Sequence, residues 1–314
     1  MVKDNLNKFQ VFKFFLGFFI SAFFLKLFIS NIKWNDFFKI LYSINYILIA
    51  FVFLVITLTY IIRICRWNIL SCNPSNWYKN NINYIYFYSC TLNVLLPFRA
   101  GDIYRVYKLR SRESGLFFNV SNLIIERSLD FFVVFLLFIV FNFSNLFMIL
   151  DKNLIYILFL IFIFLLFSVI FIYFFRLKLM QIRNKFIKNF FVHSKFFRFK
   201  STKYIAKLIG ISFLIWISEG LCYWLVAMSL RSELGSGFYI WKIFPIGTLV
   251  TLIPSMPGYI GTYDYIMQFS LNLYFEDISA ISSYIILIHT ILLVSPILLT
   301  LIVYLQKKLI LKFT

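Results

Sequence analysis

Runs of about 20 apolar residues recur along the chain, and they constrain its fold more than any other feature. An α-helix of that length rises 1.5 Å per residue and crosses the roughly 30 Å hydrocarbon core of a bilayer. Of the 314 residues, 62% are apolar or aromatic and 14% are charged, against roughly 45–50% and 25% in soluble domains. The sequence therefore predicts an all-α polytopic membrane protein and excludes a soluble enzyme built around one core.

Hydropathy predicts six full spans and two further apolar stretches that are broken by proline and glycine. The spans are expected near residues 11–30, 40–62, 116–142, 154–175, 205–229 and 279–305. The broken stretches, residues 82–112 and 239–275, are typical of re-entrant hairpins, although each could instead form two short spans. The turn residues expected there are Pro97 and Gly101 in the first hairpin, and Pro254, Pro257, Gly258 and Gly261 in the second.

The order span, span, broken hairpin, span occurs in residues 1–150 and again in residues 151–314. Because each half crosses the membrane three times, the second half begins on the opposite face. The two halves therefore predict an inverted repeat within one integral membrane domain, and no soluble domain is expected. Many secondary transporters have this arrangement, with the substrate bound near the midplane where the broken helices meet.

The net charge of +19 comes from 31 Lys and Arg residues against 12 Asp and Glu residues. Most of the basic residues, Arg66 among them, fall in connections on one side of the predicted spans, which by the positive-inside rule is cytoplasmic. We expect both termini on that side of the cytoplasmic membrane, with the charge contacting lipid headgroups rather than nucleic acid. Residues 176–207 form either an amphipathic surface segment or an ordinary orientation-setting loop. With only two histidines, no metal or cofactor is expected.

The two hairpins carry similar polar motifs. Each places an acidic residue, Asp102 or Asp264, after its proline and glycine turn, where it either caps the returning helix or contacts a substrate. Arg99 has no capping role, and an arginine at the tip of a broken helix suits bidentate pairing with a phosphate. Arg105 is a further candidate for binding the substrate.

Three charged residues, Glu126, Arg127 and Asp130, lie inside the predicted span 116–142. They form either a structural ion cluster that holds this helix to the first hairpin or a site for a headgroup or a proton. Glu219, another candidate for binding the substrate, lies in the middle of another span and is either protonated or paired with a residue from another helix. His289, in the last span, is expected to be a hydrogen-bonded core histidine rather than a ligand.

Together, LPFRAGDIYR, IIERSLD and IPSMPGYIGTYD resemble motifs of the transmembrane region of lysylphosphatidylglycerol synthases and of the wider group of flippase-like membrane proteins. The motifs of that family read approximately LPxRxGE, ERxxD and PxxPGGxGxxE, and the resemblance spans most of the chain. This sequence departs from them at Asp102 and Asp264, where Glu is common, and at Tyr259, where a second glycine is usual.

The resemblance implies a protein that moves a lipid with a polar headgroup across the cytoplasmic membrane, without catalysis in this region. The expected partners are membrane lipids, with an anionic or aminoacylated phospholipid or a polyprenyl-linked saccharide as cargo, and enzymes of envelope biosynthesis. Two alternatives are open. One is a membrane-embedded glycosyltransferase, although no DxD motif occurs, and the other is an envelope-assembly accessory protein without transport activity.

Overall fold

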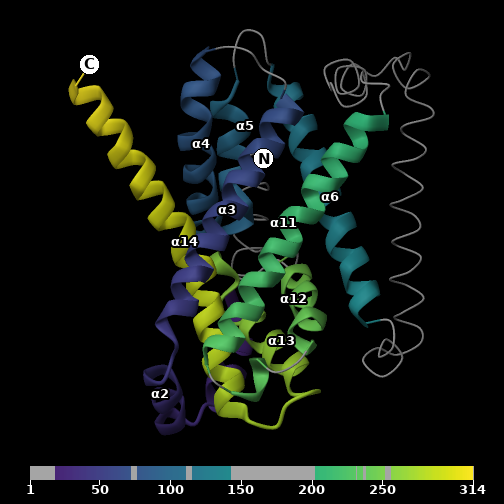
Figure 1. The fold of residues 1–314 in the computed structure, drawn as a ribbon, viewed down its shortest axis with the longest axis vertical. Helices are drawn as coiled ribbons and strands as arrows, with labels where there is room; N and C mark the ends of the chain where they lie inside the picture. Colours follow the sequence, from purple (N-terminus) through teal and green to yellow (C-terminus); the bar gives the residue numbers. More distant parts are fainter. Residues whose placement is uncertain are drawn as a thin grey trace, which may run out of the picture. The chain divides into compact units, whose positions relative to one another are not determined.

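The structure is a computed structural model that describes residues 18–71, 76–110, 115–142, 202–230, 232–235, 238–251 and 256–313 (Figure 1). Every regular element in these ranges is helical, as the apolar runs predict. Three of these helices, Tyr46–Ser71, Lys203–Ser229 and Ile278–Lys308, are long and apolar enough to cross a bilayer. The all-α fold class is therefore confirmed for the part of the chain that the structure describes.

The span predicted at residues 40–62 is helix α3 (Tyr46–Ser71), which begins and ends later than the hydropathy indicates. The start is set by Asn45, because its side-chain oxygen accepts hydrogen bonds of 3.1 and 3.4 Å from the backbone N–H groups two and three residues ahead. The residues before this cap form a separate short helix, α2 (Trp34–Tyr42), which the sequence analysis did not predict.

The spans predicted at 205–229 and 279–305 correspond to α11 (Thr202–Ser229) and α14 (Ile278–Phe313). The carboxylate of Asp277 caps α14, since it accepts hydrogen bonds of 2.9 and 3.1 Å from the first free N–H groups of the helix. Both helices therefore lie where their apolar composition places them.

Helix α6 (Leu116–Asn142) has the bounds predicted for its span, and it carries the three expected charged residues. The span predicted at 11–30 is described from residue 18 onward, as a short apolar helix, Phe18–Ser30. The span predicted at 154–175 and most of the basic stretch 176–207 lie outside the described residues. The count of six full spans, the inverted repeat and the division at residue 150 therefore stay predictions.

The chain divides into two compact units. The first contains Met1–Leu58, Tyr86–Ile103 and Ser218–Thr314, and the second contains Thr59–Ile85 and Tyr104–Ile217. Several long helices contribute residues to both units, so each unit is described below by itself.

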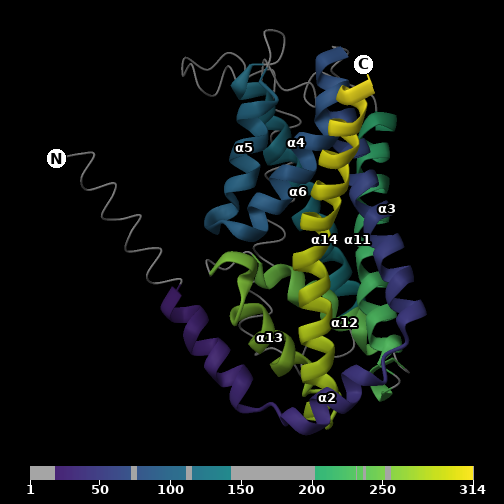
Figure 2. The same cartoon turned by 90° about the vertical axis from the view of Figure 1, so that its left-hand side faces the viewer.

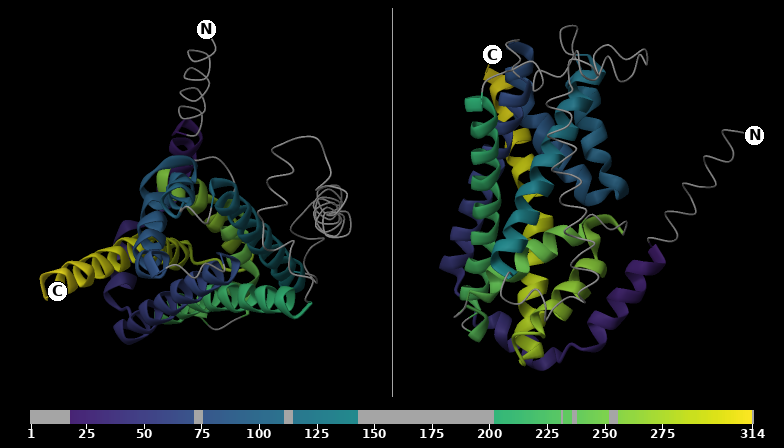
Figure 3. Two further views of the ribbon diagram at one scale, coloured as in Figure 1. Left: turned by 90° about the horizontal axis from the view of Figure 1, so that it is seen from above. Right: turned by 90° about the vertical axis from the view of Figure 1, so that its right-hand side faces the viewer.

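In the first unit, α12 (Tyr239–Val250) packs against α13 (Thr262–Leu271), and both α13 and α2 pack against α14 (Figure 2). Close packing of α12 on α13 is possible because Gly247 has no side chain to collide with Met267. Helix Phe18–Ser30 lies beside α13 (Figure 3), where the rings of Phe24 and Tyr265 stack with centroids 5.1 Å apart. The second broken stretch is therefore a helical hairpin.

The second unit contains α6, most of α5 (Ala100–Lys108), and parts of α3, α11 and α4 (Asn76–Leu95). Its helices are joined by polar contacts as well as by apolar packing. The Tyr204 hydroxyl of α11 donates a 3.1 Å hydrogen bond to the Ile69 carbonyl of α3, and the amide of Asn119 on α6 donates one of 3.2 Å to the Val106 carbonyl of α5.

Candidate functional site

Both hairpins break at a short 3-10 turn, and the two turns share a local design. The first is Pro97–Arg99, between α4 and α5, and the second is Pro257–Tyr259, before α13. Each begins with proline, which lacks an N–H group and fixes its own φ. Each ends with a non-glycine residue in the left-handed region, since φ is 52° at Arg99 and 60° at Tyr259. Such a conformation costs about 1–3 kcal/mol, and functional sites are where it is most often retained.

A glycine stands two residues after each turn, and it lies against the backbone of another helix. A Cβ atom on Gly101 would overlap the Ser89 carbonyl of α4, and one on Gly261 would overlap the Ser21 carbonyl of helix Phe18–Ser30. Gly258 and Gly261 also have positive φ values of 69° and 86°, which glycine adopts without strain. Of the turn residues expected from the sequence, Pro254 alone lies outside the described residues.

The two turns contact each other, and Arg99 is the residue that joins them. Its Nε donates a 3.2 Å hydrogen bond to the Tyr259 hydroxyl, and its Nη2 donates one of 3.0 Å to the Thr251 hydroxyl. The Arg99 side chain is half-buried. Both of its hydrogen-bond partners among the described residues are neutral, so its positive charge is not paired there with a carboxylate.

The two acidic residues of the hairpins are held in different ways. Asp102 is tied to Asn93 of α4 by two 3.1 Å hydrogen bonds, one to its carboxylate and one from its backbone N–H. Asp264 accepts a 2.8 Å hydrogen bond from the Gly261 N–H, and this contact caps α13. The capping alternative therefore applies to Asp264, whereas Asp102 fastens the start of α5 to α4. Both carboxylates are buried.

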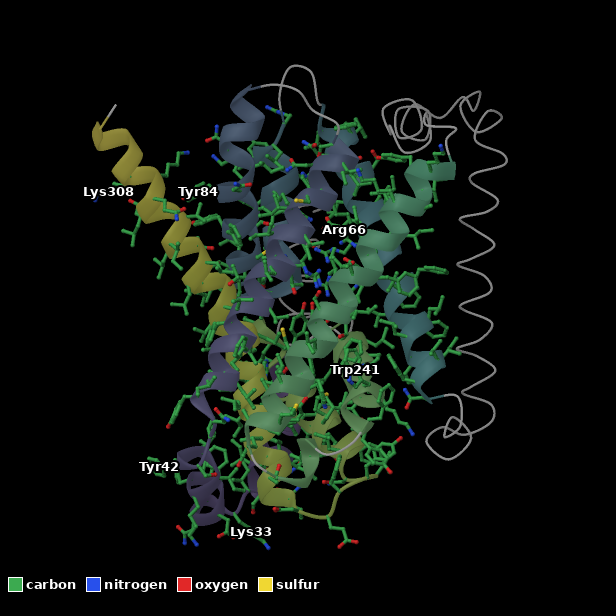
Figure 4. The ribbon with its side chains drawn as sticks, viewed as in Figure 1. Lys33, Tyr42, Arg66, Tyr84, Trp241 and Lys308 are labelled. Carbon is green, nitrogen blue, oxygen red and sulfur yellow. The ribbon has the colours of Figure 1, made fainter. Side chains whose placement is uncertain are left out.

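A buried ion cluster occupies the second unit, and Arg66 of α3 is at its centre (Figure 4). Arg66 Nη1 donates to Asp130 at 2.7 Å and to the Ser212 hydroxyl at 2.9 Å, while Nη2 donates to Glu126 at 3.3 Å. The placement of Arg66 in a cytoplasmic connection was wrong, because α3 continues past residue 62 and buries this side chain completely. An arginine within the apolar sequence IIRICRWNIL was the available signal.

The same cluster contains the expected candidates on α5 and α6. Arg105 Nη2 donates to Glu126 at 2.7 Å, and the guanidinium of Arg105 lies 4.1 Å from the centre of the Trp67 ring. Arg127 is 3.5 Å from Asp130 within α6, and its side chain is 35% exposed. The pairing of Arg105 with Glu126 supports the structural alternative, in which the cluster holds α6 to the first hairpin.

Asp130 connects this cluster to α11, since it also accepts a 3.0 Å hydrogen bond from the indole N–H of Trp216. Glu219, the remaining acidic candidate, is half-buried further along α11, in the first unit. Within the described ranges, no three His, Cys, Asp or Glu side chains gather in a way that could hold a metal ion.

Two buried amides on α6 were missed by the sequence analysis. Asn119 and Asn122 are fully buried and precede Glu126 on the same helix face, at the spacing of about one helical turn. Neither amide atom of Asn122 makes a hydrogen bond to another described residue, and the side-chain oxygen of Asn119 makes none either. A buried amide without a partner is costly and usually indicates a ligand or water contact. Asparagines inside a span were the available signal.

The sequence profile of the lysylphosphatidylglycerol synthase TM region matches residues 14–300. The chain belongs to this family. The match includes both hairpins, the ion cluster and the stripe of buried amides. Comparison with curated proteins and comparison with solved structures gave no match.

Tyr259 is the main departure from the family motif, and the geometry shows how the turn accommodates it. The residue adopts the left-handed conformation that a glycine would take at this position. Its backbone N–H donates a 2.9 Å hydrogen bond to the Met256 carbonyl, so the turn stays closed. Its hydroxyl accepts the hydrogen bond from Arg99. The tyrosine therefore keeps the turn and adds a contact that glycine cannot make.

Proposed function

We propose that this protein is a lipid translocator, which moves an anionic phospholipid or a polyprenyl-linked saccharide across the cytoplasmic membrane. The observation that carries the proposal is the position of Arg99. It stands on a strained turn where two broken helices meet, and the contacts of its charged group are with two hydroxyls rather than with a carboxylate.

The chemistry of Arg99 suits a phosphate. A guanidinium has five N–H donors, which can bind two oxygens of one phosphate at once. The hydroxyls of Tyr259 and Thr251 use two of these donors, so the others can bind an anionic headgroup. The hydroxyls also fix the plane of the guanidinium, which lowers the entropy lost when a phosphate binds.

The energetics of the membrane point the same way. A cationic group at the bilayer centre costs about 2.5–3.5 kcal/mol on insertion scales, and such groups usually pair with anions or line a transport pathway. Arg66 and Arg105 follow the first pattern, because carboxylates accept hydrogen bonds from both. Arg99 follows the second, with a lipid phosphate as its intermittent anionic partner.

Two further features, each within its own unit, suit contact with a polar headgroup. In this proposal both hairpin turns lie at membrane depth, where non-helical backbone is tolerated only if it is buried in protein or lines a water-filled cavity. In the second unit, the amide of Asn122 can both donate to and accept from a headgroup. In this proposal, the headgroup of the cargo supplies the hydrogen-bond partner of the Asn122 amide.

A flipping assay with purified protein in phosphatidylcholine vesicles tests the proposal. Labelled phosphatidylglycerol or a labelled polyprenyl phosphate should cross the bilayer faster with the protein than in protein-free vesicles. The preferred probe identifies the cargo class. If neither lipid crosses faster, the translocator proposal fails, and the result favours the glycosyltransferase or the accessory protein.

The orientation in the membrane is a separate part of the proposal. Reporters fused at Thr314 and within residues 183–200 should both report the cytoplasm, because most basic residues fall in the connections assigned to that side. An external signal from either fusion would contradict this topology.

A further inference from the structure

His289 of α14 binds two parts of the second hairpin at once. Its Nδ1 lies 2.5 Å from a carboxylate oxygen of Asp264, and its Nε2 lies 2.7 Å from the Gly258 carbonyl oxygen. The imidazole and the carboxylate are both buried. The prediction of a hydrogen-bonded histidine is confirmed. The chemistry of its two partners also shows how many protons the histidine and aspartate must hold between them.

Each of these two contacts needs a hydrogen atom between its heavy atoms. The Gly258 carbonyl can only accept, so Nε2 must carry a proton. The contact with Asp264 needs a second proton, which resides on Nδ1 or on the carboxylate. The pair therefore holds one proton more than a neutral histidine beside an ionised aspartate, whichever atom carries it.

Removing that proton leaves the two contacts one hydrogen short. In one tautomer the lone pair of Nδ1 faces the ionised carboxylate, and in the other the lone pair of Nε2 faces the Gly258 carbonyl oxygen. Both arrangements are repulsive. The pair also changes from neutral to a net charge of about −1, and among the described residues no Lys or Arg contacts either side chain. A buried negative charge without a partner is costly, so the hairpin must rearrange when the proton leaves.

We infer that Asp264 and His289 form a proton-binding site that fastens the second hairpin turn to α14 when occupied and releases it when empty. The released proton passes to water. Gly258 is the residue next to Tyr259, whose hydroxyl accepts from Arg99. Release of the Gly258 carbonyl therefore alters the turn that positions Arg99. In the context of the proposed function, on which this step rests, the site couples a proton to the movement of the anionic headgroup.

Among the described residues, the titratable groups around the pair are tyrosines and one carboxylate, Glu219 of α11, which acts electrostatically on Tyr223. The Tyr263 ring of α13 lies 4.6 Å from the imidazole, and its hydroxyl is 2.9 Å from that of Tyr223 on α11. Tyr284 of α14 donates a 3.3 Å hydrogen bond to the Tyr223 carbonyl. On the other neighbouring elements, Lys26 of helix Phe18–Ser30 is exposed, and Lys242 of α12 lies over tyrosine rings. The Asp264 and His289 pair is therefore the acid and base pair at this turn.

Nitrogen NMR of ¹⁵N-histidine-labelled protein in bicelles tests the site directly, because the chain contains only two histidines. The variant His193→Gln leaves His289 as the single label. Over a pH series from about 5 to 9, its two nitrogen resonances should shift together as the proton leaves. The proposal would be overturned if the resonances showed a single protonated ring nitrogen and did not change over this pH range.

The variant Asp264→Asn in the same background is the matched comparison. An asparagine N–H can donate to Nδ1 without an extra proton, so His289 can keep its proton on Nε2 and both contacts without the second proton. If the nitrogen resonances of this variant titrate as in the parent, the shared-proton site is excluded. This spectrum does not depend on lipid movement. If the pair loses a proton in a protein that moves no lipid, the proposed function is wrong and the proton-binding site is still supported.

The coupling step has its own measurement. Flipping of labelled phosphatidylglycerol should depend on pH in the parent protein, and that dependence should vanish in Asp264→Asn. A pH dependence that persists in Asp264→Asn would separate the proton site from transport.

Discussion

Buried or half-buried arginines occur in both units, and their partners differ. In the second unit, Arg66 and Arg105 donate to the carboxylates of Glu126 and Asp130, and the cluster joins α3, α5, α6 and α11. In the first unit, Arg99 donates to two hydroxyls and stands on left-handed backbone. In the second unit, carboxylates of the protein therefore neutralise the charges of the arginines. In the first unit, Arg99 is left as a cation that can bind an external anion.

The difference shows that membrane depth alone does not identify a functional charge. Ion pairs inside a membrane protein reduce the cost of their own burial and can be purely structural. A buried charge or amide whose partners are neutral or missing destabilises the protein, and binding of a ligand can remove that desolvation cost. By this criterion Arg99 and Asn122 are the functional candidates, and the Arg66 cluster is a structural one.

The largest effect on stability is expected from Arg66→Gln. This change leaves two buried carboxylates without their shared cation, and removing one partner of a buried pair costs about 3–5 kcal/mol. Thermal unfolding in detergent should show a large drop in midpoint, while the protein that remains folded should still flip lipid. The exposed pair of Lys39 and Asp36 provides the control, because Lys39→Gln should change little. An unfolding midpoint unchanged by Arg66→Gln would remove the structural assignment.

An effect of opposite sign is expected from Asn122→Leu. Its buried amide has no hydrogen-bond partner among the described residues, so replacing it by an apolar side chain of similar shape should raise the free energy of unfolding by about 1–3 kcal/mol. Flipping per folded molecule should fall, because a contact to the headgroup is lost. Reduced stability in the same unfolding measurement would mean that the amide has a structural partner, and Asn122 would then belong with the Arg66 cluster.

The smallest change in stability is expected from Tyr259→Phe. It removes one hydrogen bond between neutral oxygen and guanidinium and leaves the backbone unchanged, so the free energy of unfolding should fall by about 1 kcal/mol. Flipping should slow because Arg99 loses one of the two hydroxyls that orient it. Kinetics of lipid flipping at several probe concentrations would show this as weaker apparent binding. Identical kinetics in both proteins would show that Thr251 alone positions Arg99.

The sequence predicted well those features that depend on local composition. The apolar runs located α6, α11 and α14 closely, because span length is dictated by bilayer thickness. The breaks at Pro97 and Pro257 followed from the geometry of proline and glycine. The start of α3 was missed because it depends on one capping residue, Asn45, and hydropathy averages over such a residue.

The candidate site was predicted only in part, because partners are set by tertiary structure. Arg99 was identified from its place in the turn, but its neutral partners, Tyr259 and Thr251, are more than 150 residues away in the sequence. Arg66 was assigned to a loop because a charge near the end of an apolar run satisfies the positive-inside rule equally well. Asn122 was overlooked because uncharged amides hardly change a hydropathy profile.

The central claim is that Arg99 binds the anionic headgroup, and Arg99→Gln tests it most directly when flipping of labelled phosphatidylglycerol is measured per folded molecule in vesicles. The account predicts that flipping is lost while the protein still folds, since Gly101, Gly258 and Gly261 still form the turns. The thermal midpoint should fall only through loss of the two hydroxyl contacts, and far less than in Arg66→Gln. Arg99→Lys should recover part of the rate, because lysine keeps the charge without the bidentate geometry. A lower yield together with normal flipping by the surviving Arg99→Gln protein would contradict the claim, because it would make Arg99 a structural residue like Arg66.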